Sequence, residues 1–193
     1  MLISCIHFRT NNEQGVYMSD GVIMQQVKSG DLSQASILFR KYHRKIYHFL
    51  GKMSGDYHTA EDLTQNVFVK MIQYKNSYNP EMNFEAWIYR IARNSFLDHV
   101  RQKKPLVYTD LEPFQQISER DEINPEEQYN RLHQALAGLP DDDREVLILT
   151  RFQKMKYQEV AAILGTTESN VKVKVFRALE KLRITFFQLE SNQ

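Results

Sequence analysis

Apolar residues recur at helical spacing along most of the chain, and no stretch alternates as a half-buried strand would. The pattern predicts a first helix that breaks at Gly30 and Asp31, then a second over LSQASILFRKYHRKIYHFLGKM. The apolar stripe of this second helix comprises Ala35, Leu38, Phe39, Tyr42, Ile46, Phe49 and Leu50. A third helix follows Thr59, with Glu61 and Asp62 in its first turn, where the helix dipole favours anions.

A loop rich in asparagine and proline covers residues 78–83, YNPEMN, and the next helix reads FEAWIYRIARNSFLDHVRQKK. Trp87 lies on the apolar stripe of this helix, which predicts that it is a core residue. A different side of the helix carries Arg90, Arg93, Asn94 and Arg101. Five cations and two anions between Glu85 and Lys104 make this side a basic surface.

The composition changes at Pro105. Residues 105–128 hold seven acidic residues, one basic residue and three prolines, which predicts a flexible acidic linker. The chain is therefore expected to be all-α, with two small helical modules: a first module over residues 18–104 and a second over 129–193. Residues 1–17 lack a helical period and are expected to be a disordered extension, so that either Met1 or Met18 is the natural start.

Residues 157–183, YQEVAAILGTTESNVKVKVFRALEKLR, predict a helix-turn-helix. Ala161 is small enough for two helices to cross closely, and Gly165 can adopt the left-handed conformation of the turn. Thr166 or Thr167 can cap the second helix, and Val171 packs back into the crossing.

The second helix of this motif has an exposed basic face. From Lys172 to Arg183 there are five cations and one anion. A solvated basic surface is the simpler interpretation, but the cations coincide with two apolar residues that are expected to be exposed, Val173 and Phe176. This combination favours a helix that reads the major groove of DNA. The expected DNA-binding residues of this helix are Asn170, Lys172, Val173, Lys174, Phe176 and Arg177.

The whole chain of 193 residues has a net charge of only +1, so an affinity for nucleic acid must come from such local surfaces. One cysteine excludes an internal disulfide, and the six histidines form no ligand spacing, so neither a metal nor a cofactor is expected. The sequence shows neither a nucleophile paired with a general base nor a glycine-rich phosphate loop, so no pattern suggests an enzyme. Without a membrane-length apolar run or a signal peptide, the protein is expected to be cytoplasmic.

Four segments in this order resemble the extracytoplasmic-function (ECF) sigma factors of bacterial RNA polymerase, in the sigma-70 family. The segments are AEDLTQNVFVKM, FEAWIYRIARNSFLDHVRQKK, LPDDDREVLILTRF and YQEVAAILGTTESNVKVKVFRALEKLR. The resemblance covers about residues 18–186. It implies an alternative sigma factor whose first module is sigma region 2 and whose second module is sigma region 4.

The resemblance also implies partners and residue roles. Glu61, Asp62 and Gln65 would bind the clamp helices of the largest subunit of core RNA polymerase, and region 4 would bind the flap of the second-largest. In promoter DNA, region 4 would read the minus-35 element, and region 2 would capture a base of the minus-10 element. The region 2 residues expected to bind DNA are Tyr78, Asn79, Arg90, Arg93, Asn94 and Arg101. An anti-sigma factor is the expected inhibitor.

The sequence departs from its relatives on the recognition helix. Val173 and Lys174 stand where many relatives have serine and arginine. Valine cannot donate a hydrogen bond to a base edge, and lysine lacks the bidentate fork of arginine, so the promoter sequence cannot be taken from relatives. The main alternative is a dimeric transcription regulator that binds a palindrome without polymerase, but the basic, all-helical first module argues against a signal-sensing domain.

Overall fold

The computed structural model describes residues 18–102 and 125–191, which form helices and turns with no strand between them. The first module contains α1 (Asp20–Ser29), η1 (Leu32–Gln34), α2 (Ala35–Ser54), α3 (Tyr57–Gln73), η2 (Lys75–Ser77) and α4 (Phe84–Gln102). The second contains α5 (Pro125–Ala137), α6 (Asp141–Leu147), η3 (Ile148–Phe152), α7 (Tyr157–Leu164) and α8 (Glu168–Ser191). The all-α prediction is confirmed for these residues. The predicted extension and most of the predicted linker lie outside them.

The core of the first module follows the predicted helical stripes. In α2, Tyr42, Ile46 and Phe49 are buried, and the helix packs against α3, which in turn packs against α4. The prediction that Phe39 belongs to this stripe is wrong, because its side chain is 45% exposed. Phe39 lies at the rim of the core, where the rings of His43 and Phe68 lie against it.

Helix caps fix several boundaries. The Ser19 hydroxyl accepts a hydrogen bond from the backbone of Val22 and starts α1. Helix α3 begins at Tyr57, earlier than predicted, because the Asp56 carboxylate accepts hydrogen bonds from the backbone N–H groups of His58 and Thr59. The short polar side chain of Asp56, four residues before the first buried apolar residue, Ala60, therefore decides where this helix starts.

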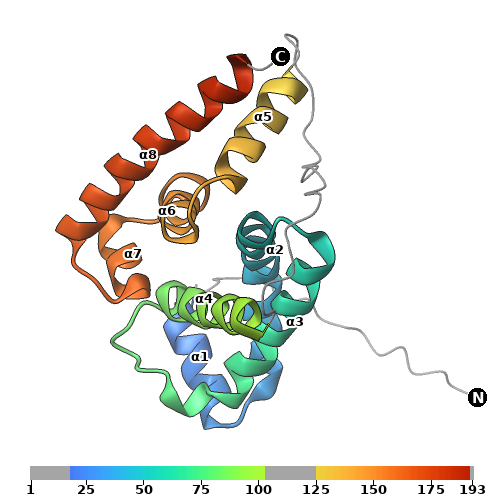
Figure 1. Ribbon diagram of the computed structural model, residues 1–193. Helices are drawn as coiled ribbons and strands as arrows, with labels where there is room; N and C mark the ends of the chain where they lie inside the picture. The colour runs from blue at the N-terminus through green and yellow to red at the C-terminus, as the bar shows by residue number, and fades with distance from the viewer. Residues whose placement is uncertain (1–17, 103–124, 192–193) are drawn as a thin grey trace, which may run out of the picture.

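The second module is built on α8, a helix of 24 residues that packs against α5, α6 and α7. Figure 1 shows α8 as the long red helix with the other three on one side of it. Helix α6 continues into a single π-helical turn, η3. Helix α5 begins at Pro125, so the last four residues of the predicted linker are helical.

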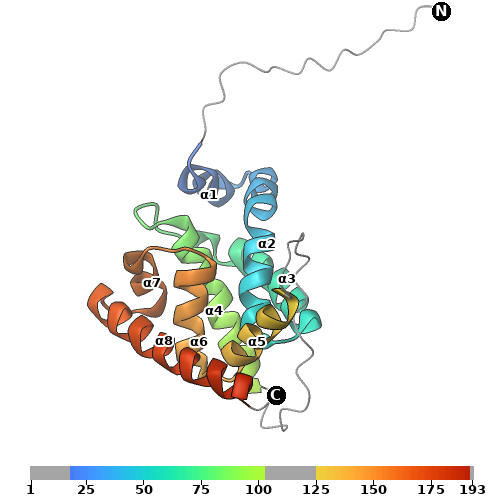
Figure 2. The ribbon, with the colours of Figure 1, turned by 90° about the horizontal axis from the view of Figure 1, so that it is seen from above.

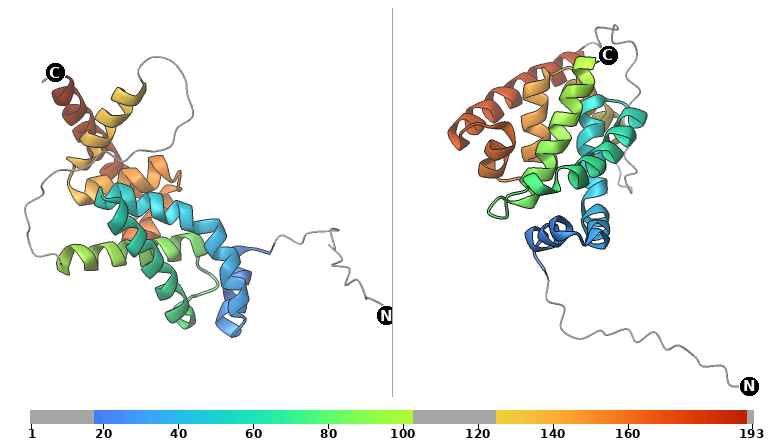
Figure 3. Two further views of the ribbon diagram at one scale, coloured as in Figure 1. Left: turned by 90° about the vertical axis from the view of Figure 1, so that its right-hand side faces the viewer. Right: turned by 90° about the horizontal axis from the view of Figure 1, so that it is seen from below.

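The two modules pack against each other. Helix α4 contacts α7, and α2 contacts α6 and η3, as the views from above and below show (Figures 2 and 3). The buried apolar residues form one cluster that runs through both modules. The sequence pattern had indicated two separate cores, so this contact is a finding of the structure. It brings part of the basic side of α4, with Arg90 and Arg93, against the second module.

Candidate nucleic-acid interface

The helix-turn-helix has the predicted geometry. Gly165 adopts a left-handed conformation with a φ of 66°, which a side chain would strain. The Thr167 hydroxyl accepts a hydrogen bond from the backbone of Asn170 at 3.2 Å and caps α8. Val171 is fully buried where α7 and α8 cross. The turn therefore presents the first half of α8 as a rigid surface.

The outer side of α8 combines cations with exposed apolar groups. Val173 is 48% exposed and Phe176 is 67% exposed, as predicted. Arg177 is exposed and has no hydrogen bond or ion pair with any other residue that the structure describes. Lys172 pairs with Glu168 at 2.9 Å, and such an exposed pair costs little to break. An unpaired guanidinium beside two exposed apolar side chains suits base edges and thymine methyl groups.

The remaining predicted residues of this face are less free. The Asn170 amide donates to the Thr166 hydroxyl at 3.1 Å, so it stabilises the turn as well as facing outward. Lys174 is half-buried. Arg177 is therefore the best-placed side chain for direct readout on this helix.

The loop over residues 78–83 is held from inside by aromatic packing. Tyr78, expected to bind DNA, is only 1% exposed, and its ring packs edge-on against Trp87 at 5.2 Å. The Tyr78 hydroxyl donates to the Met82 carbonyl, and the Lys28 ammonium donates to the backbone carbonyl of Tyr78. In this structure Tyr78 positions the loop and does not present its ring to a ligand. Asn79 remains exposed.

The basic side of α4 divides into two parts. Asn94 and Arg101 are exposed, as predicted. Arg90 and Arg93, in contrast, contact the second module. Arg90 donates a hydrogen bond from Nη2 to the Ala162 carbonyl at 2.7 Å. The Nε of Arg93 lies 2.9 Å and 3.1 Å from the two carboxylate oxygens of Glu145. Neither arginine is free to hold a phosphate in this arrangement.

Glu145 is a functional candidate that the sequence interpretation missed. It lies on α6 among buried apolar residues and is only 4% exposed. Burial raises the pKa of the Glu145 carboxyl, although the charge and hydrogen bond of Arg93 oppose this rise. Glu145 lies three residues before Ile148 and four before Leu149, and so on the same side of a helix as these two apolar residues. This spacing was the signal in the sequence that the acid is buried.

Two further polar contacts between the modules were not predicted. The Asn83 amide donates to Oε1 of Glu159 at 2.9 Å, and the Tyr89 hydroxyl donates to Oε1 of Gln153 at 2.7 Å. Glu159 also accepts from the backbone N–H of Lys156, which fixes its carboxylate at the start of α7. These contacts join the loop and the inner side of α4 to the second module.

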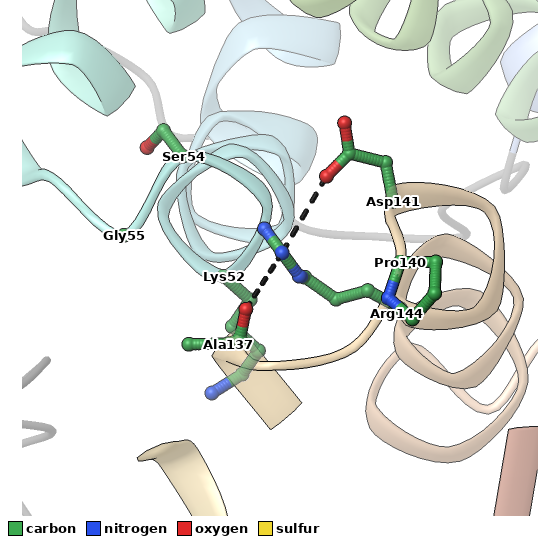
Figure 4. A pocket seen from close by; sticks show the side chains of 7 residues that line it. All are labelled: Lys52, Ser54, Gly55, Ala137, Pro140, Asp141 and Arg144. Atoms are coloured by element: carbon green, nitrogen blue, oxygen red, sulfur yellow. Dashed lines mark hydrogen bonds and ion pairs between the residues drawn. The ribbon is translucent and has the colours of Figure 1, made fainter. Parts of the chain in front are cut away.

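Arg144 joins the end of α2 to the second module. Figure 4 shows its side chain with the hydrogen bond to Ala137 and the ion pair with Asp141. Its guanidinium donates to the carbonyl oxygens of Met53, Ala137 and Leu139 at 2.8 to 2.9 Å. The open pocket beside it has a volume of about 470 Å³ and is lined by Lys52, Ser54, Gly55, Ala137, Pro140, Asp141 and Arg144. Burial lowers the pKa of the Lys52 amine to about 8, and its ammonium lies 4.6 Å from the centre of the Phe152 ring.

The face of α3 expected to bind polymerase is open. Glu61, Asp62 and Gln65 are exposed on one side of the helix, while Leu63 and Val67 are buried on the other. No cluster of potential metal ligands occurs in residues 18–102 and 125–191. Over the same residues, none of the helices combines the length and the apolar character that crossing a membrane requires.

Comparison with known proteins agrees with this division of the chain. Sigma-70 region 2 matches residues 38–105, and Sigma-70 region 4 matches residues 129–182. The first match contains all but the start of α2, together with α3 and α4, and the second contains α7 and the N-terminal part of α8. The two regions lie in the order that the four sequence segments predicted.

A curated relative covers nearly the same length. The ECF RNA polymerase sigma factor SigW of Bacillus subtilis (strain 168) is 32% identical over 174 residues, which are 83% of this chain and 92% of SigW.

Two solved structures share the fold. The structure of CnrH in complex with the cytosolic domain of CnrY has a TM-score of 0.69 at 22% identity, over 90% of this chain and 99% of that one. The sigma factor RpoE of Bartonella quintana, in complex with the anti-sigma factor NepR, has a TM-score of 0.64 at 24% identity, over 78% of this chain and 94% of that one. The sequence matches and the shared fold together place this chain in the ECF sigma factors of the sigma-70 family.

Proposed function

We propose that this sigma factor works in the cytoplasm as a dissociable subunit of RNA polymerase, with region 4 reading the minus-35 element through the outer side of α8. The observation that carries this assignment is the exposed group formed by Val173, Phe176 and Arg177 directly after a rigid turn. A recognition helix requires such a group: a free guanidinium for a base edge and apolar atoms for thymine methyls.

Arg177→Ala should weaken binding to a minus-35 duplex by about 1 to 3 kcal/mol, because a bidentate contact to guanine would be lost. The measurement is a titration of the holoenzyme with duplexes that vary one base pair at a time. Lys181→Ala is the matched control, since Lys181 lies one turn further along α8 and is already paired with Asp143. An Arg177→Ala variant with unchanged affinity and base preference would remove this residue from the reading surface.

Region 2 is proposed to capture the minus-10 element with α4 and the loop before it. Asn94 is exposed and can direct hydrogen bonds at an unstacked base, and Asn79 lies at the nearby loop. Arg101 is exposed, and its guanidinium lies 3.9 Å from Asp98, which leaves it available to phosphate. Arg90 and Arg93 can join them once their contacts with region 4 are broken.

Core polymerase is proposed to bind the exposed face of α3 that carries Glu61, Asp62 and Gln65. Asp62→Lys should weaken holoenzyme assembly at least tenfold, because it places a cation where an acidic contact is expected. A competition assay against labelled wild-type protein for purified core polymerase measures this. Gln73→Lys adds a cation at the far end of the same helix and should compete like the wild type. Equal competition by Asp62→Lys would assign this acid to the helix dipole alone.

Restraint by an anti-sigma factor is proposed from the known complexes. The Bartonella quintana sigma factor of the same fold was solved with an anti-sigma factor. In this chain, an inhibitor of that kind would have to cover the α3 face, the α8 face or both to block polymerase or DNA. The flap of the second-largest polymerase subunit is the proposed partner of region 4.

Run-off transcription tests the function directly. Core polymerase is incubated with a pooled promoter library, with and without this protein. New discrete start sites that share an upstream two-part element are expected. The absence of new start sites, together with binding of a palindrome by the protein alone, would contradict the proposal and favour a dimeric regulator.

A further inference from the structure

The contact between the modules uses side chains that the proposed function needs elsewhere. Arg90 and Arg93 are directed at region 4, where they meet the Ala162 carbonyl and the Glu145 carboxylate. The loop over residues 78–83, before α4, is also held against region 4, because the Asn83 amide donates to the Glu159 carboxylate. Acids and carbonyl oxygens of region 4 thus occupy positions that phosphate oxygens would take on the basic surface of region 2.

This packed arrangement is also too short to bind a promoter at both elements. The positions after which the minus-35 and minus-10 elements are named differ by about 25 base pairs, which is about 85 Å at 3.4 Å per base pair. Helix α8, with 24 residues, is only about 36 Å long, and α7 beside it directly contacts α4. The two DNA-binding faces therefore lie within about one helix length of each other, and the modules must separate to engage both elements.

We propose that the packed form is a closed resting state of the free protein, latched by Glu145 acting as an internal phosphate mimic on Arg93, and that opening precedes promoter capture. The proposal rests on the assignment of Arg90 and Arg93 to minus-10 DNA. Breaking the pair while the modules stay packed is costly, because one charged group would lose its partner in a largely buried place: Glu145 is 4% exposed, and Arg93 is half-buried. It can nevertheless open, because both partners gain water or phosphate on separation.

The covalent connection permits the opening. Between Gln102 and Pro125 the chain has 22 residues, whose fully extended length is about 75 Å. Added to the dimensions of the modules, this length can span the distance between the two promoter elements. Polymerase would stabilise the open form by binding each module at its own site, so that the second contact becomes intramolecular.

Glu145→Gln tests the latch, because glutamine keeps the shape of the side chain and removes its charge. Fluorophores are attached at Gln25→Cys on α1 and Gln158→Cys on α7, both exposed, in a chain that also carries Cys5→Ser. Energy transfer between them reports the separation of the modules. We expect Glu145→Gln to lower the transfer efficiency of the free protein, and core polymerase to lower it in the wild type as well.

Binding of DNA by the free protein gives the second readout. The probe is the single-stranded non-template minus-10 segment of a promoter mapped by run-off transcription. Glu145→Gln should bind it about five to ten times more tightly than the wild type. Asp142→Asn is the charge control. It removes an exposed acid of the same helix that has no hydrogen bond or ion pair within the described residues. Because the negative charge of Asp142 raises the pKa of Glu145, its removal favours the ionised latch and should neither lower the energy transfer nor tighten binding of the single strand.

Arg93→Gln separates the two roles of this arginine. It breaks the same latch, so the energy transfer should fall, but it also removes a phosphate contact, so the affinity for the single strand should not rise. Unchanged energy transfer in both Glu145→Gln and Arg93→Gln, with circular dichroism showing intact helices, would overturn the latch. Failure of the proposed function would be seen differently, as absent start sites in run-off transcription while the energy transfer still responds to Glu145→Gln.

Discussion

Trp87→Ala is expected to lower the free energy of unfolding by about 3 to 5 kcal/mol, the range for removing a large buried aromatic side chain. Trp87 is almost fully buried, and it lies 5.2 Å from the Tyr78 ring and 6.0 Å from the Phe84 ring. The cavity left behind would also free Tyr78, which anchors the loop proposed to capture the minus-10 base. Promoter opening should therefore fall even where enough folded protein remains to bind polymerase.

Urea unfolding followed by far-ultraviolet circular dichroism measures this effect. Tryptophan fluorescence cannot follow this variant, because Trp87 is the only tryptophan in the chain. Tyr74→Ala, which removes an exposed aromatic side chain at the end of α3, should change the free energy of unfolding by no more than about 0.5 kcal/mol. A Trp87→Ala protein with the stability of the Tyr74→Ala protein would show that the aromatic cluster does not support this module.

Arg144→Ala is expected to destabilise the protein by about 3 kcal/mol. Its guanidinium is largely buried and satisfies three carbonyl oxygens, those of Met53, Ala137 and Leu139. Removing the side chain leaves these acceptors without their charged donor, and each buried unsatisfied group costs about 1 to 3 kcal/mol unless water replaces it. Because Met53 belongs to the other module, the contact between α2 and α6 should loosen as well.

The same urea titration, combined with hydrogen exchange at the ends of α2 and α5, detects both effects. Arg151→Ala is the control, since Arg151 is exposed and has no hydrogen bond or ion pair with the described residues. Equal unfolding midpoints for the two variants would mean that water replaces the guanidinium at no cost.

Local features were predictable because they depend on residues close in sequence. The helical period identified Val171 and Trp87 as core residues, and Gly165 marked a turn that its left-handed conformation confirms. Phe39 was misplaced because periodicity says which side of a helix a residue lies on, and not how far the core extends along that side. Tyr78 was misplaced for a related reason, since nothing in the loop sequence showed that Trp87 would cover its ring.

The contacts between the modules could not be predicted from the pattern. Arg93 is a plausible phosphate ligand in any basic helix, and only the packing of α4 beside the second module shows that Glu145 meets it first. The two residues are separated by the acidic segment, so no local period links them. Whether Asn94, Arg101 and Arg177 bind DNA is decided by the promoter and the polymerase, neither of which the chain encodes.

The pairing of Arg93 with Glu145 has a consequence for how binding depends on salt. An arginine already neutralised by an internal acid expels no counterions from DNA, whereas each arginine that takes over a phosphate adds about 0.7 to the slope of log affinity against log salt for a single strand. The free protein should therefore show a shallow slope and the holoenzyme a steeper one. The slope of log affinity against log salt would therefore count how many of the protein's cations have exchanged a protein partner for DNA.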